Sequence, residues 1–118
     1  MKSALKKPDR SLDAVFAALA DPTRRAIVER LASGTASVTE LAEPFKLSQP
    51  AISKHLKVLE KAGLISQARE AQRRPRLLEP DRIRQLQTWI ETYAKHLEAT
   101  YERLDRYLQT LQSKEDSP

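Results

Sequence analysis

The sequence predicts a mainly α-helical fold with one short β-hairpin and a long C-terminal helix. Three observations support this prediction. Apolar residues recur at helical spacing through residues 11–65, short strand-like segments follow Gly63, and nothing breaks a helical pattern from Pro80 to Gln112. A chain of 118 residues is long enough for one domain with a modest core.

Two helices are expected after a flexible basic arm at residues 1–10. The segment Ser11 to Ala20 carries apolar residues at helical spacing. Asp21-Pro22 then starts a second helix, because Asp is a good N-cap and Pro fits the first helical position. Gly34 is expected to end that helix, since glycine accepts a left-handed conformation without steric cost.

Two further helices are joined by a very short link. Thr39 is expected to cap the first, Glu40 to Lys46, which Pro44 should shorten or distort because it lacks a backbone donor. The second helix begins after Ser48 as its cap and ends at Gly63. Two helices joined this tightly predict a helix-turn-helix.

The second of these helices has two chemically opposite faces. Its apolar stripe consists of Ile52, Leu56 and Leu59. Its other face carries Lys54, Lys57 and Lys61. A short helix with one cationic face, in a small basic chain, is typical of a helix that enters a DNA groove. The alternative is a basic face that is merely solvated.

The net charge of +5 is unevenly distributed. Basic residues are in excess over residues 1–10 and 48–76, whereas residues 11–47 and 77–118 carry slightly more acidic than basic side chains. The positive charge therefore gathers on the candidate groove helix and its neighbours, as expected for a nucleic-acid-binding surface.

A basic hairpin is expected directly after the groove helix. Leu64 to Glu70 and Arg76 to Glu79 are the expected strands, joined by residues 71–75. Arg73 and Arg74 lie at its tip, and Arg69 lies at its base. A hairpin in this position is the wing of a winged helix, suited to phosphates or to the minor groove. An ordinary basic hairpin is the alternative.

The last helix is long enough to need a partner. Its apolar residues recur at spacings of three and four for about four heptads. We expect a second copy of the same helix to cover it, with the N-terminal helix alongside, through Leu12, Phe16, Ile90, Tyr93, Leu97, Tyr101, Leu104 and Leu108. An intramolecular core helix is the alternative, and we expect its first two turns to have that role. The sequence thus divides into an arm (1–10), a DNA-binding domain (11–80), a dimerisation helix (81–112) and a disordered tail (113–118).

Several other functions find no support in the residues. There is no cysteine and there are only two glycines, which excludes disulfides, thiolate metal sites and a phosphate-binding glycine loop. Scattered surface carboxylates such as Glu40 and Glu43 have no nucleophile or histidine beside them, so we expect no enzyme and no cofactor. No apolar run is long enough to cross a bilayer and no signal peptide opens the chain, so a cytoplasmic location without membrane association is expected.

Three segments resemble the ArsR family of bacterial winged-helix repressors: LADPTRRAIVERLASG (19–34), VTELAEPFKLSQPAISKHLKVLEKAGLI (38–65) and the basic hairpin. The long C-terminal helix is similar to a cysteine-free branch of that family. The resemblance implies a homodimer that binds palindromic operators, often represses its own operon and releases DNA on binding an inducer. The residues then expected at double-stranded DNA are Ser48, Gln49, Pro50, Ser53, Lys54, His55, Lys57, Arg69, Arg73 and Arg74.

The chain departs from the family at the known metal sites. Ser37 and Thr39 stand where metal-sensing members have thiolates, and neither is a useful ligand for thiophilic ions. On the C-terminal helix His96 has carboxylates nearby but no second histidine. A solvated helix-face histidine is the simpler interpretation, so no metal site is predicted and the inducer is not identified. The alternative is a weak Zn or Ni site to which each of two subunits contributes His96 and carboxylates.

Two alternatives compete with an operator-binding repressor. One is a basic architectural protein that binds nucleic acid without sequence preference. The other is a helical protein-interaction dimer whose basic face is incidental. Salt-dependent DNA binding and competition by random DNA would separate the three.

Overall fold

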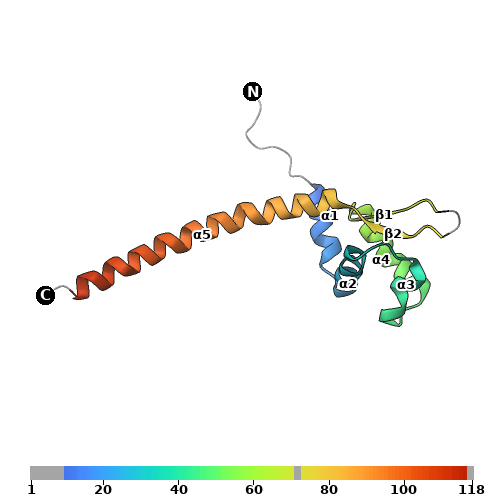
Figure 1. The fold of residues 1–118 in the computed structure, drawn as a ribbon, viewed down its shortest axis with the longest axis horizontal. Coiled ribbons are helices and arrows are strands. Elements are labelled where there is room, and N and C mark those ends of the chain that lie inside the picture. The colour runs from blue at the N-terminus through green and yellow to red at the C-terminus, as the bar shows by residue number, and fades with distance from the viewer. Residues whose placement is uncertain (1–9, 71–72, 117–118) are drawn as a thin grey trace, which may run out of the picture. The chain divides into compact units, whose positions relative to one another are not determined.

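A computed structural model describes residues 10–70 and 73–116 of the chain. The elements are α1 (Arg10–Leu19), α2 (Pro22–Ala32), α3 (Val38–Ala42), the 3-10 turn η1 (Glu43–Phe45), α4 (Gln49–Lys61), β1 (Ile65–Gln67), β2 (Arg76–Leu78) and α5 (Pro80–Asp116) (Figure 1). This is the predicted mainly helical fold with one hairpin. The chain divides into two compact units, Met1–Leu86 and Gln87–Pro118.

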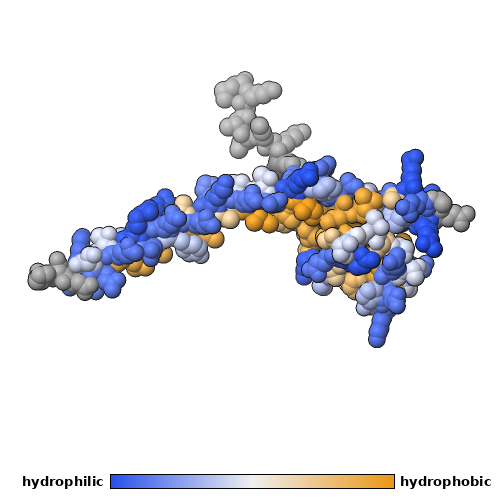
Figure 2. Space-filling model, viewed as in Figure 1, coloured by the Kyte–Doolittle hydropathy of each residue, from blue (hydrophilic) through white to orange (hydrophobic). Residues whose placement is uncertain are grey.

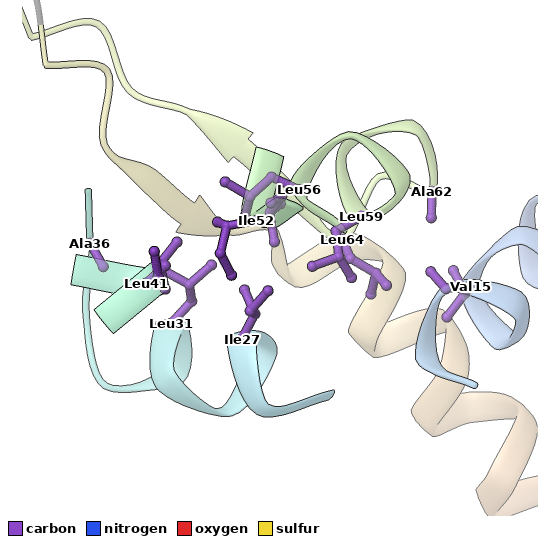
Figure 3. Packing of buried hydrophobic residues seen from close by; sticks show 13 residues of the cluster. Val15, Ile27, Leu31, Ala36, Leu41, Ile52, Leu56, Leu59, Ala62 and Leu64 are labelled. Carbon is purple, nitrogen blue, oxygen red and sulfur yellow. The ribbon is translucent and has the colours of Figure 1, made fainter. Parts of the chain in front are cut away.

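One hydrophobic core holds the first unit together (Figure 3). The largest side chains buried in it are Val15, Ile27, Leu41, Ile52, Leu56, Leu59 and Leu64. They come from α1 to α4 and from the loop before β1, and no polar side chain is buried among residues 10–70 and 73–116. Ile83 and Leu86, in the first two turns of α5, pack against this core, as expected.

The α1–α2 corner is fixed by the residues of the sequence DPTRR. Asp21 caps α2 by accepting a hydrogen bond from the backbone N–H of Arg24 at 3.0 Å, as predicted. This bond and the nearby guanidinium of Arg24 lower the pKa of Asp21. The side chains of Arg24 and Arg25 then reach back to the last turn of α1, where they donate to the carbonyls of Ala18 and Leu19 at 2.6 and 2.8 Å. Two arginines therefore satisfy carbonyls that the end of α1 leaves open.

The α3 helix starts earlier than expected. Ser37, rather than Thr39, is its N-cap, and the pair Ser37 and Glu40 forms a capping box with two reciprocal hydrogen bonds of 3.1 Å. The bond from the Ser37 backbone N–H holds the pKa of Glu40 below its usual value. As expected from Pro44, the helix is short: it ends at Ala42 and continues only as the η1 turn.

The hairpin strands are shorter than predicted. They pair antiparallel with Ile65 opposite Leu78 and Gln67 opposite Arg76, whereas the sequence suggested strands over 64–70 and 76–79. Pro75 has no backbone N–H to donate, so regular pairing stops beside it. The strand β2 also bridges to Ala36, which ties the hairpin to the loop after α2.

Helix α5 extends beyond its predicted end at Gln112. It continues to Asp116, so residues 113–116 of the expected tail are helical. No breaker stands between Gln112 and Asp116, and Lys114 in the last turn interacts favourably with the helix dipole. Residues 1–9 of the expected arm and 117–118 of the expected tail lie outside the described residues. None of the described helices is both long and apolar enough to span a membrane.

Candidate nucleic-acid interface

The candidate groove helix α4 has the predicted limits. The Ser48 hydroxyl accepts from the backbone N–H of Ala51 at 3.3 Å, and Pro50 lies in the first turn, where a missing N–H costs nothing. Gly63 follows the helix with φ of 77°, a left-handed value that favours glycine. A Cβ atom at Gly63 would also lie 3.0 Å from Nε of Arg82. Glycine is thus favoured at position 63 for two reasons: the left-handed backbone conformation and the lack of room for a side chain beside Arg82.

The link between α3 and α4 is a tight turn. Lys46 takes a left-handed conformation with φ of 54°, which lets the chain reverse between η1 and Ser48. The side-chain amide of Gln49 donates to the Thr39 hydroxyl at 3.0 Å and so connects the starts of the two helices. Ser48, Gln49 and Pro50 are all exposed. The structure therefore has the helix-turn-helix arrangement, and the first turn of its second helix, α4, is exposed to solvent.

The two faces of α4 are separated as the sequence indicated. Ile52, Leu56 and Leu59 are at most 1% exposed. On the other side Lys54, Lys57 and Lys61 are exposed, and Ser53 is half-buried at the edge. The core thus holds the helix by its apolar stripe and leaves three ammonium groups toward solvent.

His55 lies between these two faces. Its side chain is 24% exposed, and its Nδ1 atom is 3.3 Å from a guanidinium nitrogen of Arg24 and 3.9 Å from a carboxylate oxygen of Asp21. The sequence predicted a DNA contact for this histidine but gave no sign of these two neighbours, because they come from α2. The ring thus has two neighbours on one side: Asp21, which caps α2, and Arg24 in the first turn of that helix.

The wing carries the three predicted arginines. Arg69, Arg73 and Arg74 are exposed, and Arg74 has a left-handed φ of 42°. Residues 71 and 72 of the expected tip lie outside the described residues. Gln67, Ala68, Arg69 and Arg74 line a concavity of about 410 Å³ at the base of the wing. Two guanidinium groups on a concave surface suit a phosphate group.

Sequence reasoning missed Arg76 and Glu60. The Nε atom of Arg76 lies 2.9 Å from a carboxylate oxygen of Glu60 on α4, and its guanidinium also donates to the Arg74 carbonyl at 2.6 Å. One side chain therefore ties the wing to the groove helix. The residues are 16 positions apart, and no short-range pattern indicates such a pair.

The predicted dimer residues lie in both compact units of the chain. On α1, Leu12 is half-buried and Phe16 is 41% exposed. On α5, apolar side chains of the predicted stripe are each at least half exposed: Ile90, Tyr93, Leu97, Tyr101, Leu104 and Leu108. Apolar residues along this helix are visible among polar ones in Figure 2. A long exposed apolar stripe marks a surface that binds another protein.

The comparison with known proteins agrees with this geometry. Residues 21–67 match the family model described as "Bacterial regulatory protein, arsR family". The HTH-type transcriptional regulator Rv2034 of Mycobacterium tuberculosis is 46% identical over 84 residues, which cover 71% of this chain and 78% of that protein. The chain belongs to the ArsR family. It is accordingly a DNA-binding transcriptional regulator with a winged helix-turn-helix fold.

Further relatives and solved structures are consistent with this assignment. The transcriptional repressor SdpR of Bacillus subtilis is 45% identical over 58 residues, covering 49% of this chain and 64% of SdpR. The crystal structure of the ArsR family transcriptional regulator RHA00566 superposes with a TM-score of 0.69 at 36% identity, covering 75% of this chain and 97% of that one. The homodimeric winged helix-turn-helix domain Mb0332 of Mycobacterium bovis gives a TM-score of 0.59 at 26% identity, over 79% of this chain and 93% of that one.

This ArsR-family regulator uses the residues at the family's thiolate position for structure. The Ser37 hydroxyl caps α3, and the Thr39 hydroxyl accepts from Gln49. On α5, His96 is exposed and its ring lies 6.3 Å from that of Tyr93. Over the described ranges of the chain, no three His, Asp or Glu side chains are grouped as a metal site requires.

Proposed function

We propose that this ArsR-family regulator is a homodimeric repressor that binds an inverted-repeat operator. The observation that carries the proposal is the exposed cationic face of α4, held on a rigid core by an opposite apolar stripe. Gln49 in the first turn of α4 and Ser53 in the next turn would read base edges, while Lys54 and Lys57 would meet the groove and its phosphates. The remaining proposed contacts are Ser48, Pro50, His55, Arg69, Arg73 and Arg74.

The wing supplies the second part of the proposed interface. Arg69, Arg73 and Arg74 are exposed on the hairpin that follows α4, and Arg76 connects the hairpin to that helix. Guanidinium groups in this position suit phosphates or the adjacent minor groove. Because phosphate contacts carry no sequence information, the wing would add affinity and fix the register of α4.

Dimerisation is proposed from the exposed apolar residues of α1 and α5. The printed description of the Mb0332 domain as homodimeric supports it, as does the length of the stripe on α5. A two-fold dimer presents two groove helices about 34–36 Å apart, which matches two half-sites one helical turn apart on DNA. The proposed dimerisation element is α5 beyond the first unit, with Leu12 and Phe16 of α1.

Repression is proposed because SdpR, and SmtB of Mycobacterium tuberculosis, are named as repressors. The protein would act in the cytoplasm by occupying DNA rather than by catalysis. An inducer would release it, through a site other than the thiolate position that Ser37 and Thr39 occupy. These two hydroxyls already have partners within the fold.

The test is binding of the purified protein to labelled DNA from upstream of its own gene. A specific repressor binds one palindromic segment and resists competition by random DNA, and its affinity falls steeply with salt. Equal competition by random DNA would indicate the architectural alternative instead. Binding with no salt dependence, or no binding, would favour a protein-interaction dimer.

A further inference from the structure

The side chain of Arg24 joins the end of α1 to the groove helix. Its Nε donates to the Ala18 carbonyl at 2.6 Å, and one terminal nitrogen donates to the Ala17 carbonyl at 3.3 Å. The other terminal nitrogen lies 3.3 Å from Nδ1 of His55 on α4. Two carbonyl contacts therefore hold the guanidinium beside His55.

A hydrogen bond between the Arg24 guanidinium and Nδ1 of His55 is compatible with only one neutral tautomer of His55. A guanidinium has donors and no acceptor, so a hydrogen bond from Arg24 requires that Nδ1 accept. In the neutral ring the proton is then on Nε2. The carboxylate of Asp21 is farther from Nδ1, at 3.9 Å, and its Oδ2 atom already accepts from the backbone N–H of Arg24.

We propose that Arg24 is a positioning residue for DNA binding: it fixes the tautomer of His55, so that Nε2–H is the donor offered to a phosphate oxygen of the operator. Arg24 acts through His55 and does not itself touch DNA. The proposal rests on the proposed function, because it needs His55 to lie at the DNA. It adds α2 to the elements that determine the chemistry of the interface.

Arg25 provides a matched control. Its guanidinium also donates to a carbonyl at the end of α1, that of Leu19 at 2.8 Å. Since Arg25 is the next residue on the helix, its replacement removes the same charge and a similar cap. The two arginines differ in that the guanidinium of Arg24 also contacts His55. If Arg24 only capped α1, replacing it would lower stability but would leave the tautomer of His55 as it is in the Arg25 variant.

The first experiment determines the tautomer directly. A long-range proton–nitrogen correlation spectrum of the free protein distinguishes protonated from unprotonated ring nitrogens. The chain has only two histidines, and His55→Gln identifies the signals of His55. We expect neutral His55 to carry its proton on Nε2, to become a mixture of tautomers in Arg24→Met, and to stay unchanged in Arg25→Met. A proton on Nδ1 in the unaltered protein overturns the proposal even if Arg24→Met fails to fold.

The second experiment is a double-mutant cycle on operator binding. Arg24→Met should weaken binding about 3- to 10-fold, the worth of one ordinary hydrogen bond. Arg25→Met should change it less than about twofold. Alanine at position 55 has neither the Nε2–H donor nor the Nδ1 acceptor, so in His55→Ala the Arg24→Met change should cost nothing further. An undiminished loss in that background would contradict action through His55.

The outcomes separate this inference from the proposed function. If the unaltered protein binds its operator but Arg24→Met binds equally well, the inference is wrong and the proposed function stands. If the unaltered protein prefers no DNA sequence, the proposed function fails, and with it the DNA part of the inference. The spectrum of the free protein still decides whether Arg24 sets the tautomer.

Discussion

Arg76 on β2 and Glu60 on α4 form an ion pair with 2.9 Å between Nε and Oε1, and their side chains are only 13% and 26% exposed. The amide of Gln67 on β1 donates to the same carboxylate oxygen at 3.1 Å. Both strands of the wing therefore meet one side chain of the groove helix. The Glu60 carboxylate thus helps to fix the orientation of the wing relative to α4, together with the bridge from β2 to Ala36.

Removing this carboxylate should loosen the wing. Glu60→Ala leaves the guanidinium of Arg76 poorly solvated and without its partner, and we expect a loss of about 1–3 kcal/mol in the free energy of unfolding. Urea denaturation followed by circular dichroism measures it. Glu29→Ala is the control, because Glu29 is exposed on α2. Equal midpoints for the two variants would show that the ion pair contributes nothing.

Lys54→Ala should weaken operator binding roughly tenfold without changing the melting temperature. The reason is that Lys54 is exposed, on the side of α4 opposite the apolar stripe. Its charge should therefore contribute to DNA binding and not to the stability of the fold. Fluorescence anisotropy with labelled operator gives the affinity. Lys95→Ala on α5 removes the same charge elsewhere and should bind as the unaltered protein does. A matching fall in melting temperature would assign Lys54 a structural role.

Arg73→Ala should reduce the salt dependence of binding. One lost phosphate contact lowers the slope of log affinity against log salt concentration by about one unit. The slope is measured from titrations at several salt concentrations. Arg106→Ala, an exposed arginine on α5, should leave the slope unchanged. If Arg73→Ala keeps the full slope, Arg73 has no phosphate partner.

Leu97→Glu should separate the dimer. Leu97 is 53% exposed within the apolar stripe of α5, and a carboxylate there would be buried against the partner helix. Sedimentation velocity should show a monomer, at concentrations where the unaltered protein is dimeric. Ala99→Glu introduces the same charge two residues further, on the other side of the helix, and should remain dimeric. An intact Leu97→Glu dimer would assign the interface to other residues.

Patterns that act over a few residues predicted most of the fold. The Asp21 cap, the Ser48 cap, the stop at Gly63 and the faces of α4 each depend on neighbours within one or two turns. The capping box of Ser37 and Glu40 could also have been predicted from neighbouring residues, since the sequence contains the spacing S-x-x-E. A cap at Thr39 leaves Val38 outside the helix, whereas Val38 is the first residue of α3.

The contacts between distant segments were not predictable in the same way. The partners in Arg76–Glu60 and Arg24–His55 are 16 and 31 positions apart, so only the packed core brings them together. The candidate DNA-binding residues could therefore be predicted from their charge and their position on a helix. The side chains that hold them in place could not be predicted, because those contacts depend on tertiary structure.

The hydroxyl of Ser37 has a consequence for how this lineage can change. A cysteine here would supply the thiolate that the resemblance to metal-sensing members of the family places at this position. A thiol is a much weaker hydrogen-bond acceptor than a hydroxyl, so the same substitution would weaken the capping box that starts α3. A thiolate ligand at position 37 would therefore impair the helix that packs before the groove helix. A side-chain oxygen at this position stabilises the start of α3, and a sulfur atom does so poorly.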